Sequence, residues 1–148
     1  MKRSERMGVM VKLIERQEQQ AARALGFAQT HLEQERNKLA ELKDYLRAYE
    51  GEMTTKGSAG ISGAQWQNYQ YFIGQLEQLI RQQHGVIQQA QRQVVDMQQK
   101  WHQVHQKRKT MDSFVESIRF DEWLVSEKKE QKEMDDLVLQ MRRQVHSQ

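Results

Sequence analysis

Apolar side chains recur along the first part of the chain at alternating steps of three and four residues. Of thirteen positions counted in this way from residue 11 to residue 53, eleven are apolar or aromatic. A repeat that averages about 3.5 residues over such a length is typical of a helix in a left-handed coiled coil. The stripe consists of Val11, Ile14, Glu18, Ala21, Leu25, Ala28, Leu32, Glu35, Leu39, Leu42, Leu46, Tyr49 and Met53.

A second stripe with the same spacing runs from residue 66 to residue 118. Its polar exceptions are Gln83 and Arg108. The two stripes predict two long helices, the first over about residues 4–55 and the second over about residues 63–144. The second stripe consists of Trp66, Tyr69, Ile73, Leu76, Ile80, Gln83, Ile87, Ala90, Val94, Met97, Trp101, Val104, Arg108, Met111, Val115 and Ile118.

A cluster of small residues separates the two stripes. Ser62 is a suitable N-cap for the second helix, Gln65 stands three residues on to complete a capping box, and Ile61 is placed to pack on Trp66. Gly57 and Gly60 can adopt the positive φ values at which helices end. We therefore expect a turn over about residues 56–62, and so short a connection makes its two helices antiparallel neighbours.

The predicted fold is all-α: a single domain, residues 1–148, that forms a long two-helix antiparallel coiled-coil hairpin with unequal arms. Because the second arm is longer, residues beyond about 118 are expected to extend past the first arm. The stripe loses its phase after Val125 and resumes at Met134. This overhang includes three large apolar residues without an expected partner in the hairpin: Phe120, Trp123 and Leu124.

Two interpretations fit the overhang. Unpaired apolar groups on a helix are typical of a docking or self-association surface. Isolated exposed apolar residues are also common on helices that bind nothing.

The residues that flank the two stripes near the turn are unusual. Flanking positions of a two-helix coiled coil are commonly charged, yet here they hold Tyr45, Phe72 and Leu79. In an antiparallel hairpin these positions share one edge, so they predict either a partner-binding strip or a widened hydrophobic seam. The six residues of the predicted strip are Leu42, Tyr45, Tyr49, Phe72, Leu76 and Leu79.

Composition and charge narrow the function classes. Hydrophobic residues make up 37% of the chain and charged residues 29%, with no proline and no cysteine. So few apolar residues fill a narrow seam and favour a polar coiled coil over a compact enzyme core. Apolar runs are too short for a membrane span, and the net charge of +3 is spread over interleaved acids and bases. We expect a cytosolic protein that neither inserts into membranes nor binds nucleic acid.

Candidate catalytic and metal-binding groups are sparse. His102 and His105 lie one turn apart on the second helix, but no carboxylate within a turn completes a metal shell. The chain has no Gly-rich phosphate loop and no nucleophile elbow. We expect no catalytic residue, no metal and no cofactor, and hence no enzyme.

The turn region resembles the flagellar FliJ family. The likeness is most specific in "LKDYLRAYEGEM" followed by "GSAGISGAQWQNYQYFIGQLE", and "AARALG" and "EKKEQKEMDD" are similar to family segments. The resemblance implies a soluble component of the flagellar type III export apparatus, similar to the stalk subunit of rotary ATPases. It also implies a cytoplasmic location, peripheral to the inner membrane at the flagellar base.

The resemblance further implies partners. These are the hexameric export ATPase, the cytoplasmic linker of the large export-gate membrane protein, and export chaperones. The gate contact would use the predicted strip, from Leu42 to Leu79, and the ATPase contact would use the paired terminal ends. The alternative from another class is a self-associating structural coiled coil unrelated to export, with the overhang as its dimer seam.

Overall fold

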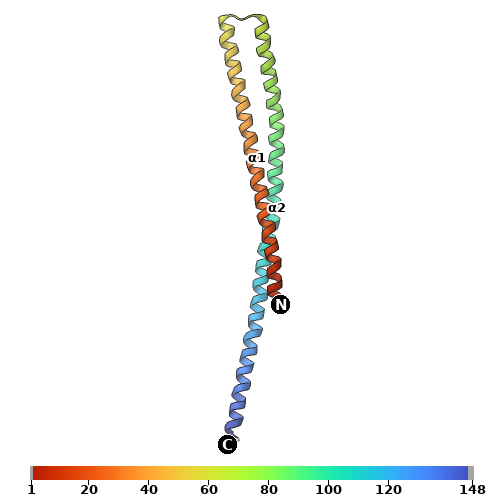
Figure 1. Cartoon of the computed structure of the whole chain (residues 1–148), viewed down its shortest axis with the longest axis vertical. Helices are drawn as coiled ribbons and strands as arrows, with labels where there is room; N and C mark the ends of the chain where they lie inside the picture. The colour runs from red at the N-terminus through yellow and green to blue at the C-terminus, as the bar shows by residue number, and fades with distance from the viewer. Residues whose placement is uncertain (1, 147–148) are drawn as a thin grey trace. The chain divides into compact units, whose positions relative to one another are not determined.

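The computed structural model describes residues 2–146 and consists of two helices. Helix α1 spans Arg3–Ala59 (57 residues) and helix α2 spans Gly63–His146 (84 residues). Figure 1 shows them joined by one tight turn, with α1 coloured red to yellow and α2 green to blue. The predicted all-α hairpin with unequal arms is confirmed.

The predicted end of the first helix is too early. Helix α1 continues to Ala59, not to about residue 55, so the loop covers residues 60–62 and not 56–62. The polar residues there fit into the helix because their hydroxyls donate to carbonyls one turn earlier: Thr54 Oγ1 to Glu50 O (2.9 Å) and Ser58 Oγ to Thr54 O (3.0 Å).

The turn depends on Gly60 and Ser62. Gly60 has a φ of 89°, a left-handed conformation that favours glycine, and it ends α1. Ser62 caps α2 as predicted, since its Oγ accepts a hydrogen bond from the Gln65 backbone N–H at 3.2 Å. Gly57 does not end the helix. It leaves room for the Trp66 ring, because a Cβ at position 57 would lie 3.2 Å from Cζ3 of Trp66.

Contacts between the helices divide the hairpin into two parts, residues 20–102 with the turn and residues 2–19 with 103–146. In the turn part, Ala28, Ile87 and Ala90 are buried together with the polar Glu35. In the other part, Ile14, Val115, Ile118 and the polar Ser4 are buried. No large side chain among the described residues is fully buried, as expected where only one helix covers another.

The predicted stripes coincide with this seam. Every position of both stripes is buried or half-buried except Trp66, which is 39% exposed at the turn. The step of three and four residues therefore identified the helix faces that meet.

Candidate partner-binding surface

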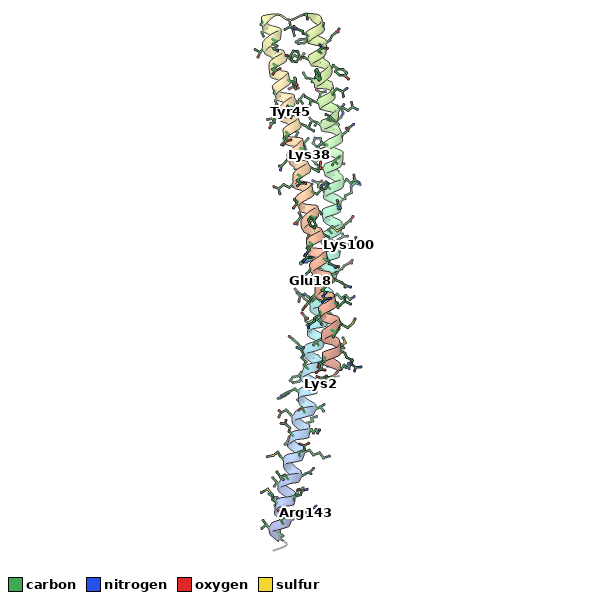
Figure 2. The ribbon with its side chains drawn as sticks, viewed as in Figure 1. Lys2, Glu18, Lys38, Tyr45, Lys100 and Arg143 are labelled. Atoms are coloured by element: carbon green, nitrogen blue, oxygen red, sulfur yellow. The ribbon has the colours of Figure 1, made fainter. Side chains whose placement is uncertain are left out.

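The predicted strip lies on the turn part of the hairpin. Tyr45, Phe72 and Leu79 are 59%, 53% and 45% exposed. Figure 2 labels Tyr45 on α1. The remaining strip residues belong to the seam and are half-buried: Leu42, Tyr49 and Leu76.

Aromatic contacts connect the exposed Phe72 with the seam residue Tyr49. The rings of Tyr49 and Phe72 are stacked, with centroids 6.2 Å apart and an interplanar angle of 16°. Tyr71 meets Phe72 edge-on at 6.0 Å and is itself 65% exposed. Tyr71, the neighbour of Phe72 in the sequence, thus joins the strip through this contact. The three rings form one partly exposed aromatic surface, the kind of group that anchors protein partners.

Glu35 and Gln83, the polar exceptions of the two stripes in this part, face each other across the seam. Gln83 Nε2 donates to Glu35 Oε2 at 2.6 Å and to the Glu35 carbonyl at 2.8 Å, and Lys38 Nζ lies 3.2 Å from Oε1. The Gln83 hydrogen bond, opposed by burial and assisted by Lys38, lowers the pKa of the Glu35 carboxyl. The hydrogen bonds therefore favour the ionised form of this carboxylate although its side chain is buried.

A second polar pair joins the other two exceptions, Glu18 and Arg108. Glu18 Oε2 accepts a hydrogen bond from Arg108 Nε, and His105 Nδ1 lies 3.3 Å from the same oxygen. Arg108 also donates to Asp112 at 2.9 Å. Burial raises the pKa of Glu18, but the hydrogen bonds from Arg108 and His105 outweigh it and lower that pKa overall.

Sequence reasoning missed both pairs. Each stripe contains two polar exceptions, and in an antiparallel hairpin the first exception of one helix meets the second of the other. The order of the exceptions along the two helices was therefore the available signal. These pairs explain why polar residues interrupt the stripes.

Helix pairing continues further along α2 than the sequence predicted. Glu122 accepts two hydrogen bonds from Ser4, from its Oγ at 2.7 Å and from its backbone N–H at 3.2 Å. The Ser4 hydroxyl and amide lower the pKa of Glu122. Pairing with α1 thus reaches at least Glu122, past residue 118.

The three apolar residues predicted on the overhang are only partly covered. Phe120 and Trp123 are 58% and 55% exposed, and their rings contact each other with centroids 5.9 Å apart. Leu124 is half-buried. Phe120 and Trp123 thus form a small exposed aromatic pair on either side of Glu122, the residue that pairs with Ser4 near the start of α1.

Other kinds of site have little support in residues 2–146. This range contains no group of three or more His, Cys, Asp or Glu residues able to hold a metal ion. Neither helix, over the residues described, has a stretch apolar and long enough for a membrane crossing. His105, one of the two histidines considered as ligands, contacts Glu18 instead.

A hairpin with a thin seam and an exposed aromatic edge defines the chain as a two-helix coiled-coil protein. Residues 2–146 match the family described as Flagellar FliJ protein, and the chain belongs to that family. It is 30% identical over 124 residues to the Flagellar FliJ protein of Escherichia coli (strain K12) and 28% identical over 124 residues to that of Salmonella typhi. Each alignment covers 84% of both chains. No solved structure matches the chain.

Proposed function

We propose that this protein is a non-enzymatic component of the flagellar protein export apparatus that bridges the export ATPase ring and the export gate. Membership of the FliJ family supports a flagellar role. The exposure of Tyr45, Phe72 and Leu79 supports the gate contact in particular, because a residue that only widened the seam would be covered. The protein acts in the cytoplasm, associated with the inner membrane through these partners.

In this proposal, two different surfaces of the hairpin bind the two partners. The strip near the turn binds the cytoplasmic linker of the gate, while the paired ends around Ser4 and Glu122 bind the ATPase ring. Phe120, Trp123 and Leu124 supply apolar contact area at those ends. Export chaperones are further partners in this proposal, and they deliver substrates to the same assembly.

A binding titration against the cytoplasmic portion of the export gate tests the strip. Replacing Tyr45→Ala and Phe72→Ala together is expected to weaken binding by a factor of about 30 or more, since one central anchor contributes about 2 kcal/mol. The matched control is Phe27→Ala, which removes an aromatic side chain that is 76% exposed on α1 but lies outside the strip. Circular dichroism verifies that every variant keeps its helices.

Equal binding by the double variant and the Phe27→Ala control would refute the gate contact at the strip. The structural coiled-coil alternative makes a different prediction: a stable dimer that persists when the chain is dilute, no binding to the gate, and no response to the strip substitutions. A mixture of ATPase ring and gate fragment that co-sediments only when the hairpin is present would support bridging.

A further inference from the structure

The final segment of α2 has a face that α1 does not cover. Residues 125–146 are all exposed. Within them, an apolar stripe at steps of four, three and four residues is 43–72% exposed: Met134, Val138, Met141 and Val145. Val138, Met141 and Val145 also line a shallow hollow together with Arg142 and His146. This face has the pattern of one half of a coiled-coil seam.

The stripe has the same spacing, four, three and four residues, when it is read from either end. When a second copy of the segment is laid antiparallel, Met134 lies opposite Val145 and Val138 lies opposite Met141. The two-fold axis repeats both pairs, so two copies form four apolar layers without a gap. The same surface is then used by both copies, as in an isologous dimer.

Charges beside the stripe select this orientation. Asp135 and Arg142 each follow a methionine of the stripe directly, and in an antiparallel coiled coil these equivalent flanking positions pair with each other. Asp135 of each copy therefore meets Arg142 of the other, on both sides of the axis. A parallel pair would instead place Glu130 beside Asp135 of the second copy, two like charges.

We propose that two copies of this chain associate antiparallel through residues 134–145 of α2. Four layers form an interface well below about 1,200 Å², which places it among weak, reversible associations. We expect a dissociation constant between about 1 μM and about 1 mM, so the chain is monomeric when dilute. This interface does not involve the strip and does not depend on the proposed export function.

Sedimentation velocity over a concentration series tests the association with the full chain. Val138→Lys places a charge in the second layer of each copy and is expected to weaken dimerisation at least about tenfold. Leu139→Lys is the matched control, because Leu139 is similarly accessible, at 50% exposed against 43% for Val138, but lies beside the stripe and not in it. It should change the dissociation constant by less than about twofold. A chain that stays monomeric up to about 1 mM, or equal effects of the two substitutions, overturns the proposal.

Charge reversal tests the pairing. Asp135→Arg alone and Arg142→Asp alone each put like charges on both sides of the axis, so each variant should dimerise more weakly than the wild type. An equimolar mixture of the two variants restores opposite charges at both positions. We expect the mixture to form a heterodimer at least about tenfold more readily than either variant pairs with itself. No preference for the mixed dimer would contradict the antiparallel pairing.

Cross-linking tests the orientation directly, since the chain has no cysteine. A mixture of Met134→Cys and Val145→Cys variants should form the mixed disulfide under mild oxidation. Each variant alone should cross-link slowly, because the antiparallel seam places identical copies of these end positions eleven residues apart, about 16 Å along the helix. Preferential disulfides between two Met134→Cys chains would show a parallel pair and exclude the proposed arrangement.

Discussion

The polar residues of the seam distinguish this hairpin from a uniform coiled coil. A two-helix seam buries little apolar surface, so each layer contributes a large share of the stability. Here the pairs Glu18–Arg108 and Glu35–Gln83 replace apolar layers. Polar layers of this kind reduce stability but define which residues face each other. The register of α1 on α2 is therefore specified by hydrogen bonds as well as by packing.

Gln83→Leu tests the contribution of one such layer. The substitution removes the amide that donates to Glu35 at 2.6 Å and leaves the buried carboxylate with less compensation, so we expect the melting temperature to fall by about 3 °C. The double variant Glu35→Leu/Gln83→Leu replaces the layer with apolar packing and should melt above the wild type. Thermal melts followed by circular dichroism measure both effects.

Gln82→Leu is the control for that pair, because Gln82 is exposed on α2 next to Gln83. Its melting temperature should stay within about 1 °C of the wild type. A destabilised double variant would mean that the Glu35–Gln83 pair stabilises the hairpin by itself.

At the same scale, the sequence predicted the seam but not the exposure of its edge. The step of three and four residues depends only on helix geometry, so it located positions such as Ile14 and Ile87 correctly. The exposure of Tyr45 and Phe72 depends on how closely the helices approach, and no pattern encodes that distance. The sequence therefore left a partner-binding strip and a widened seam as alternatives, and in the structure both of these side chains are more than half exposed.

At the scale of the elements, the helices are defined by how they end. Ser62 was recognisable as an N-cap because the capping pattern is local and chemical. The end of α1 was not, since Gly57 and Gly60 are both compatible with a helix end, and only the φ of 89° at Gly60 distinguishes them. The close approach of Trp66 explains the glycine at position 57 in another way.

Gly60→Ala tests the turn. A Cβ at this left-handed position is strained, so the substitution should lower the free energy of unfolding by about 1 kcal/mol. Gly51→Ala is the matched comparison, because Gly51 lies inside α1 with nothing within 4 Å of its added Cβ. That substitution should raise the free energy of unfolding by about 0.5–1 kcal/mol. Urea titrations followed by circular dichroism compare the two, and a stabilised Gly60→Ala variant would contradict the role of Gly60.

At the scale of the whole molecule, ionised carboxylates occur in both parts of the hairpin. Glu18, Glu35 and Glu122 each accept hydrogen bonds from the other helix, and the pKa of each is lowered from the ordinary value of 4.5. A lowered native pKa stabilises the fold above the unfolded pKa, and that contribution is lost as the pH falls through the native value. The stability of the hairpin is thus linked to protonation at acidic pH.

We therefore expect the melting temperature to be nearly constant from about pH 7 to about pH 5 and to fall below about pH 4.5. Glu35→Gln should make the decrease smaller, because one of the three linked carboxylates is absent. Glu130→Gln, at an exposed position of α2 beyond the paired region, should leave the profile unchanged. A melting temperature that is constant down to about pH 3 would show that these carboxylates do not stabilise the native hairpin.

The two polar pairs also have a mechanical consequence. If a load slid one helix along the other by seven residues, apolar seam residues would again meet, but Glu35 would come to face Leu76 or Ala90. Glu18 would likewise face Trp101 or Val115, and both carboxylates would lose their donors. In a seam that was apolar throughout, the layers after such a slide would be equivalent to those before it. Here the slide would also remove the hydrogen-bond donors of two carboxylates, in addition to unwinding helix beside the three-residue turn.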